Sequence, residues 1–150
     1  MITLHDLADT ERLGRLIGNV ATPGDVLVLT GELGAGKTTL TKGIALGLEI
    51  QQMIKSPTYT IIREYETGRL PLYHMDIYRV EGDTDELGLE EYFEGDGLAV
   101  VEWGQLLSEP PVDYVELVIE VLDHERTVSL TAHGQQSAAF VERIMKEWQA

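Results

Sequence analysis

The sequence has no cysteine, which excludes disulfide bonds and thiolate metal sites. It also has no apolar run that approaches the roughly 20 residues a helix needs to cross a bilayer. The segment Met1 to Asp6 is followed by Asp9 and Glu11, where a signal peptide would have a basic region and an apolar block. We therefore expect a soluble cytoplasmic protein.

Basic residues are also scarce. Eleven lysines and arginines stand against 26 acidic residues, and the formal net charge is −15. Such a surface repels nucleic-acid phosphates at long range, so the protein is not expected to bind nucleic acid without a basic partner protein. Most of the acids are interpreted as keeping the surface soluble. Those between Asp83 and Asp96 are crowded enough to form a candidate patch for a partner.

The length gives no reason to expect a second folded module. A chain of 150 residues, of which 43% are hydrophobic, is sufficient for one core. No internal repeat or low-complexity tract interrupts it. We therefore predict a single domain over residues 1–150.

A phosphate-binding motif is the strongest signal that the sequence does contain. Residues 31–38 read Gly-Glu-Leu-Gly-Ala-Gly-Lys-Thr, between the apolar run Val26–Thr30 and a segment from about Thr38 to Leu48 that suits a helix. The glycines let backbone N–H groups approach phosphate oxygens closely. Lys37 is expected to reach the β- and γ-phosphates and Thr38 to bind Mg²⁺ through its hydroxyl, with both side chains partly facing solvent.

The rest of the chain alternates strand and helix patterns. Apolar spacing predicts an amphipathic helix between Asp6 and Val20 that starts near Thr10. Strands are predicted over Thr58–Glu66, Leu70–Tyr78, Leu98–Val101, Tyr114–Leu122 and Arg126–Thr131, and helices over Asp83–Phe93 and Gln135–Trp148. The residues expected on the core faces of the first and last helices are Leu7, Leu13, Leu16, Ile17, Val20, Ala139, Phe140, Ile144 and Trp148. This order predicts an α/β, P-loop NTPase-like three-layer sandwich with a mainly parallel central sheet and antiparallel edge strands.

Two predicted strands end on an acid, at Asp76 and at Glu102. Phosphoryl chemistry needs a carboxylate at such a strand end to hold Mg²⁺ or to orient water. Glu102 follows four apolar residues, and we interpret it as the direct or water-mediated Mg²⁺ group. An ordinary strand-end or helix-capping role is the alternative for Asp76.

Other residues give weaker signals. The hydroxyls of the segment Ser56–Thr60 could sense the γ-phosphate, although hydroxyls in turns more often bond to backbone groups. His74 is interpreted as a packed or hydrogen-bonded histidine, and Trp103 as a core or interface residue. No Asn-Lys-x-Asp segment that would read guanine is present, which favours adenine as the base.

Taken together, these blocks resemble the bacterial TsaE ATPases of tRNA threonylcarbamoyladenosine biosynthesis. Besides the phosphate loop, four further blocks carry the resemblance over about Val26 to Gly104. They are Lys55-Ser56-Pro57-Thr58-Tyr59-Thr60, Tyr73-His74-Met75-Asp76-Ile77-Tyr78-Arg79, Glu86-Leu87-Gly88-Leu89-Glu90-Glu91-Tyr92-Phe93 and Val101-Glu102-Trp103.

The resemblance implies a small ATPase that binds a TsaD–TsaB type complex and supports modification of adenosine 37 in tRNAs reading ANN codons, without transferring the group itself. It implies ATP and Mg²⁺ as cofactors and tRNA contact only through partners. It places the nucleotide on Leu33, Gly34, Ala35, Gly36, Lys37, Thr38, Thr39, Thr58, Thr60 and Trp103, the metal on Thr38 and Glu102, and catalysis on Lys37, Asp76 and Glu102. The adenine would lie near Leu7 to Thr10.

Two other functions remain open from the residues alone. One is a small-molecule kinase, although no lid or substrate domain that would exclude water is visible. The other is a nucleotide-sensing adaptor in which hydrolysis is incidental. The expected ATPase is weak alone and depends on its partner proteins.

Overall fold

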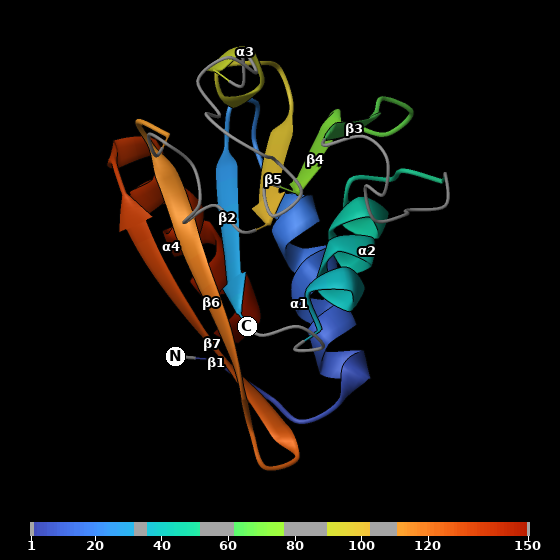
Figure 1. Ribbon diagram of the computed structural model, residues 1–150, viewed down its shortest axis with the longest axis vertical. Helices are drawn as coiled ribbons and strands as arrows, with labels where there is room; N and C mark the ends of the chain where they lie inside the picture. Colours follow the sequence, from blue (N-terminus) through green and yellow to red (C-terminus); the bar gives the residue numbers. More distant parts are fainter. Residues whose placement is uncertain (1, 32–35, 52–61, 77–89, 103–110, 150) are drawn as a thin grey trace.

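The computed structural model describes residues 2–31, 36–51, 62–76, 90–102 and 111–149 (Figure 1). The described strands are β1 (Ile2–Leu4), β2 (Val26–Gly31), β3 (Ile62–Tyr65), β4 (Leu72–Asp76), β5 (Leu98–Glu102), β6 (Tyr114–Leu122) and β7 (Glu125–His133). The described helices are α1 (Leu7–Val20), α2 (Lys37–Gly47), α3 (Glu90–Phe93) and α4 (Gln135–Gln149). None of these helices is both long and apolar enough to cross a membrane.

The strands form one sheet in the order β1-β7-β6-β2-β5-β4-β3. Its centre is parallel, because β2 pairs with both β6 and β5, and β5 pairs with β4. Its edges are antiparallel, because β3 pairs with β4, β6 with β7, and β7 with β1. The central strands β2 and β5 are apolar on both faces, as strands of a covered parallel sheet are. The predicted fold class is confirmed.

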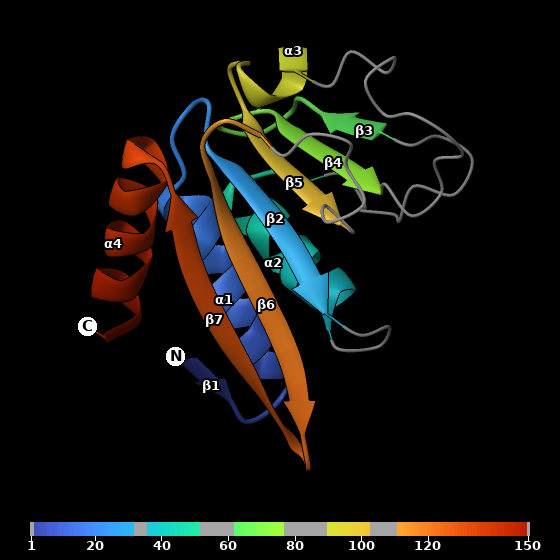
Figure 2. The same cartoon turned by 60° about the vertical axis from the view of Figure 1, so that its left-hand side comes forward.

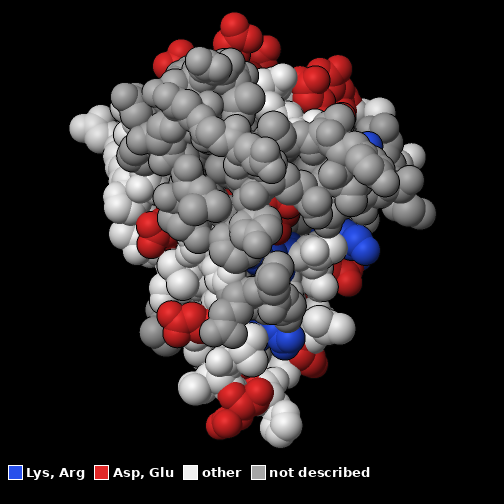
Figure 3. Space-filling model, viewed as in Figure 1, with Lys and Arg blue, Asp and Glu red and all other residues white. Residues whose placement is uncertain are grey.

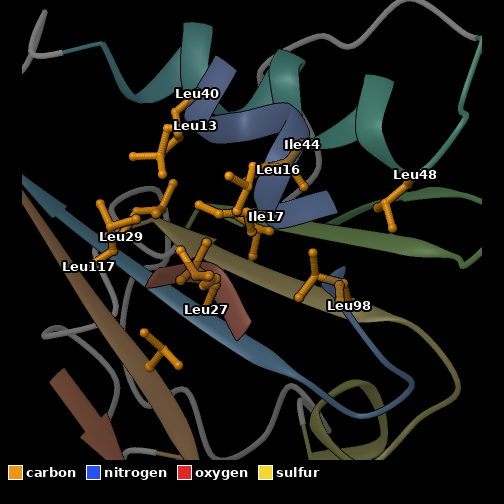
Figure 4. Close-up of a cluster of buried hydrophobic side chains, with 14 of the residues drawn as sticks. Leu13, Leu16, Ile17, Leu27, Leu29, Leu40, Ile44, Leu48, Leu98 and Leu117 are labelled. Atoms are coloured by element: carbon orange, nitrogen blue, oxygen red, sulfur yellow. The ribbon is translucent and has the colours of Figure 1, made fainter. Parts of the chain in front are cut away.

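Helices lie on both faces of this sheet (Figure 2). The larger core joins α1, α2 and α4 to one face, and Figure 4 shows its leucines and isoleucines between α1, α2 and the strands. The smaller core lies on the opposite face, where Tyr92 and Phe93 of α3 pack against Val28, Met75 and Val101. Side chains alternate between faces along a strand, so the central strands β2 and β5 contribute to both cores.

Helices α1 and α2 pack through glycines spaced four residues apart on each helix. Gly14 and Gly18 of α1 face Gly43 and Gly47 of α2. A Cβ added to Gly18 would meet the backbone oxygen of Ile44 and would lie 2.9 Å from the Cα of Gly47. The helices therefore touch through their backbones, and no side chain fits between them.

Replacing Gly18 with alanine should destabilise the fold. An added methyl group that meets backbone typically costs about 1–3 kcal/mol, from which the roughly 1 kcal/mol that alanine gains over glycine in a helix must be subtracted. The free energy of unfolding, measured with urea, should therefore fall by up to about 2 kcal/mol. Asn19→Ala, on the exposed face of the same helix, is the control and should be neutral or stabilising. If Gly18→Ala also left the free energy of unfolding unchanged, this result would contradict the close packing of the two helices.

Asp113 caps the amino-terminal end of α4. Its carboxylate accepts hydrogen bonds from the backbone N–H of Gln136 at 3.0 Å and of Ser137 at 2.9 Å, and from the Ser137 hydroxyl. Burial alone would raise the pKa of Asp113, but the hydrogen bonds from the Ser137 side chain, the Ser137 backbone and the Gln136 backbone bring it below its ordinary value. The charged carboxylate is therefore the form that stabilises α4.

Asp113→Asn should lower the stability at neutral pH by about 0.5–1 kcal/mol, the smaller part of the range for an N-terminal cap because solvent screens this carboxylate. The folded-state pKa is depressed, so the contribution is present above the unfolded-state value of 3.8 and is lost as the pH falls through the folded-state pKa. Urea unfolding of both proteins at pH 7 and below pH 3 should give curves that converge at the low pH. Asp123→Asn, in the β6–β7 turn, should shift neither curve. A pH-independent difference would exclude the charge as the cause.

Several expectations from the sequence are wrong in detail. Helix α1 starts at Leu7, three residues before the predicted start, because Asp6 is the N-cap and accepts a hydrogen bond from the Asp9 N–H at 2.8 Å. Leu7 is 59% exposed and Ala139 is exposed, so neither joins the core with its helix neighbours. Strand β1 was not predicted, since three residues are too few to show a period of two.

Three predicted elements extend outside the described residues. The strand over Thr58–Glu66 is described only as β3, the strand over Leu70–Tyr78 only as β4, and the helix over Asp83–Phe93 only as α3. The remaining predicted elements are present with ends shifted by a few residues, and Phe140 and Ile144 of α4 are buried as expected.

Candidate functional site

The carboxyl ends of three parallel strands meet at one edge of the sheet. In the register of these strands, Glu102 of β5 lies beside Leu29 of β2 and beside Asp76 of β4. The phosphate-loop motif begins at Gly31, two residues after Leu29. Ligands of open α/β sheets bind at this edge, so the topology brings both predicted acids to the place where the loop leaves the sheet.

Asp76 and Glu102 also share a face. Leu72 of β4 and Leu98 and Val100 of β5 belong to the core under α1 and α2, whereas Met75 and Val101 belong to the opposite core. Because side chains alternate, Asp76 and Glu102 lie on the α1 and α2 face. Helix α2 begins beside this edge, so both acids stand on its side of the sheet.

The start of α2 has the backbone that the motif predicts. Gly36 is the N-cap residue, with φ of 107°, and no side chain of the described residues caps the helix. A left-handed glycine at this position leaves the first N–H groups of the helix directed outward, where an anion can accept them. Thr38, on the first turn, is exposed, and Thr39 is half-buried.

Lys37 differs from expectation. Its residue is only 6% exposed, and its ammonium donates to the carbonyl oxygen of Gly31 at 3.2 Å. The side chain is thus folded over the beginning of the loop and does not extend into solvent. The contact holds its charge beside the loop, which is where the motif requires it.

Glu102 is held by a buried partner. Nε2 of His74 lies 2.6 Å from Oε2 of Glu102, and the two side chains are 2% and 11% exposed. His74 precedes Asp76 by two residues on β4 and therefore shares its face. The interpretation of His74 as a hydrogen-bonded histidine is confirmed, but its partner was not predicted.

Arg126 is a residue near the loop that sequence reasoning missed. A Cβ built on Gly36 would lie 3.5 Å from Nε of Arg126 and 3.8 Å from Cδ1 of Ile119. Both residues come from the β6–β7 hairpin, about 90 residues along the chain. No local pattern marks Arg126, because its position depends on β6 lying beside β2 in the sheet.

Charge is distributed unevenly on the face seen in Figure 3. Acidic side chains are visible from the top of this face to the bottom, while few basic side chains are visible, and those near the middle have acidic side chains beside them. The protein as a whole carries a net charge of −15. Positive charge is thus scarce, and Lys37 and Arg126 bring two cations to the loop.

Comparison with known proteins identifies the family. The family model described as "Threonylcarbamoyl adenosine biosynthesis protein TsaE" matches residues 4–129. The chain belongs to the TsaE family. Among its relatives, the tRNA threonylcarbamoyladenosine biosynthesis protein TsaE of Bacillus subtilis is 47% identical over 140 residues, which cover 92% of this chain and 89% of the relative. The corresponding protein of a Nostoc species is 44% identical, over 79% of this chain and 76% of the relative.

A solved structure agrees with the TsaE assignment. The crystal structure of Bacillus subtilis YdiB superposes with a TM-score of 0.85 at 41% sequence identity, covering 97% of this chain and 93% of that one. The similarity therefore extends beyond the blocks between Val26 and Gly104 on which the resemblance rested. The family recognised from sequence is confirmed.

Some residues assigned by the TsaE resemblance lie outside the described residues. These are Leu33, Gly34 and Ala35 of the loop, Thr58 and Thr60, and Trp103. Near the expected adenine position, Leu7 is exposed and Thr10 is fully buried in the first turn of α1. The described part of the predicted site is therefore Gly36, Lys37, Thr38, Thr39, Asp76 and Glu102, which the fold gathers at one edge.

Proposed function

We propose that this chain is an ATPase that binds ATP with Mg²⁺ at the edge where β2, β4 and β5 end. The observation that carries the proposal is the meeting of three features there: the uncapped start of α2, the ammonium of Lys37 over the loop, and the carboxylates of Asp76 and Glu102. The start of a helix can bind the phosphates of a nucleotide, and two nearby carboxylates can bind the metal ion that accompanies these phosphates. A site for a phosphate alone would not need the acids.

The residues present suit Mg²⁺. Among the described residues, no group of three or more His, Asp or Glu side chains could hold a metal by itself. Nucleotide-bound Mg²⁺ does not need such a group, because it takes one or two protein oxygens together with phosphates and water. We assign the exposed hydroxyl of Thr38 and the carboxylate of Glu102 to the metal, which would neutralise charge on the β- and γ-phosphates.

The remaining residues have complementary roles in this proposal. Leu33 to Thr38 would hold the phosphates through backbone N–H groups, and Lys37 would stabilise their charge. Asp76, beside Glu102, would orient the attacking water or a metal-bound water. The segment Ser56–Thr60 would lie near the γ-phosphate, Trp103 near the nucleotide or the partner surface, and the adenine near Leu7 to Thr10.

The proposed output is action on partner proteins. With a TsaD–TsaB type complex, the ATPase would support threonylcarbamoylation of adenosine 37 in tRNAs reading ANN codons, and it would not transfer the group itself. Membership of the TsaE family supports this role. The net charge of −15 also supports it, because tRNA is then better contacted through partners.

The proposal is tested by the rate of ATP hydrolysis with and without the partner pair. We expect slow hydrolysis by the chain alone and a clear increase when a TsaD–TsaB pair is added. If the chain neither formed a complex with the pair nor hydrolysed ATP above background, the proposal would be contradicted. Transfer of radiolabel from ATP to a metabolite in the absence of partners would instead indicate a small-molecule kinase.

A further inference from the structure

The pair formed by His74 and Glu102 has a geometry that packing alone does not require. In the parallel register of β4 and β5, His74 lies beside Val100, and Asp76 lies beside Glu102. The carboxylate of Glu102 nevertheless contacts His74, which lies two residues before Asp76 on β4, and Oε2 lies 2.6 Å from Nε2.

The direction of this hydrogen bond follows from the chemistry of its two groups. A carboxylate can only accept, so Nε2 of His74 carries the hydrogen and donates it. The other ring nitrogen, Nδ1, is buried and has no hydrogen-bond partner among the described residues. The hydrogen bond from Nε2 to Glu102 is therefore the one that the His74 ring makes among the described residues.

This bond restricts a flexible side chain. A free glutamate loses side-chain entropy when it is fixed in one orientation. At Glu102 that ordering is present before any ligand binds, because one oxygen is held by a side chain that is itself 2% exposed. No contact of the other oxygen with a described residue is seen, so within the described part of the chain it can serve a metal. Partners that orient a metal-binding side chain in this way commonly contribute 10- to 100-fold to metal affinity.

We propose that His74 is a positioning residue, which holds Glu102 in the orientation that binds the Mg²⁺ of the nucleotide. The inference rests on the proposed function, because it needs Glu102 to be a metal group. It adds a residue that touches neither nucleotide nor metal and acts only through Glu102.

Two substitutions separate this role from packing. Glutamine at position 74 can place an amide N–H near the position of Nε2, so His74→Gln keeps a donor for Glu102. Asparagine places its amide near the position of Nδ1 and is too short to reach, so His74→Asn removes the donor while keeping an amide. Both variants place a polar amide in the same buried position and differ mainly in reach.

The measurement is nucleotide binding by calorimetry, with a non-hydrolysable ATP analogue, in EDTA and across a series of Mg²⁺ concentrations. We expect His74→Asn to weaken the apparent Mg²⁺ affinity of the complex by 10-fold or more, and His74→Gln to stay within about 3-fold of the unsubstituted protein. Binding in EDTA should be unchanged in both. In a Glu102→Gln background, His74→Asn should cause no further loss.

Other results would overturn the inference. If both variants keep full Mg²⁺ affinity, or lose it equally, His74 has no positioning role. If the unsubstituted protein binds no nucleotide, the proposed function itself fails. If it binds nucleotide with Mg²⁺ and the variants do so equally well, only the role of His74 fails, so the two failures are distinguishable. If the variants do not fold, a measurement on the unsubstituted protein replaces them. Long-range ¹H–¹⁵N spectra should show that the His74 ring carries its hydrogen on Nε2. A hydrogen on Nδ1 instead would overturn the inference.

Discussion

Replacing Glu102 with glutamine should lower the rate of Mg²⁺-dependent ATP hydrolysis by about 100-fold or more, with nucleotide binding in EDTA unchanged. Glutamine keeps the size of the side chain and an oxygen that can accept from His74, but it removes the negative charge at the end of β5. Removing one fixed group that stabilises developing charge typically costs about 10²–10³ in rate. Single-turnover hydrolysis with and without Mg²⁺ gives the comparison.

A matched control is available on α4. Glu142→Gln removes the same charge from an exposed position on a helix that does not carry the site, and should leave hydrolysis unchanged. Equal rates for Glu102→Gln and the unsubstituted protein would contradict the metal assignment. Glu102→Gln also tests the adaptor alternative when it is assayed with the partner pair and tRNA. If tRNA modification persists although this variant does not hydrolyse ATP, an adaptor role is favoured.

Replacing Lys37 with alanine should weaken ATP binding by about 10- to 100-fold while the protein remains folded. The ammonium is 3.2 Å from the Gly31 carbonyl and lies over the start of the loop, so binding of phosphates gains a charged donor that is already in place. Hydrogen bonds to charged groups contribute about 1.5–3 kcal/mol, which corresponds to this range of affinity. Calorimetric titration with an ATP analogue gives the dissociation constant.

The control for Lys37 lies on the same helix. Lys42→Ala removes a lysine from the exposed side of α2 and should leave the dissociation constant within about 2-fold, since solvent screens a charge at that position. A circular dichroism spectrum confirms that α2 persists in both variants. Wild-type affinity in Lys37→Ala would contradict the assignment of the loop.

Much of the candidate site was predictable from sequence because its signals are local. The glycines and Lys37 form a motif within eight residues, and Asp76 and Glu102 each follow an apolar strand pattern. Placing both acids at one edge needed only the rule that carboxyl ends of parallel strands meet.

The parts that were missed depend on which strands become neighbours. Arg126 reaches the loop only because β6 inserts between β2 and β7, and the sequence carries no mark of that order. The bond between His74 and Glu102 needs the register of β4 against β5, which a shift of one residue would abolish. The burial of Lys37 depends on a contact with the Gly31 backbone, which the motif does not encode.

The glycine packing of α1 against α2 was missed for a different reason. Gly14, Gly18, Gly43 and Gly47 are visible in the sequence at four-residue spacing, but glycine within a helix ordinarily lowers confidence in the helix. Here it marks the surface through which two helices approach.

The strand order has a consequence for how the chain folds as it is made. Strand β2, which leads into the phosphate loop, pairs with β5 and β6, and these begin at Leu98 and Tyr114. Neither neighbour exists while the first two-thirds of the chain leaves the ribosome, and β1 must wait for β7. Pairing between strands that are far apart in the sequence slows folding. The entropy cost of closing the long loop between them arises before the contacts that offset this cost have formed. An amino-terminal fragment would therefore expose the apolar β2, which has both of its neighbouring strands only once β6 has been synthesised.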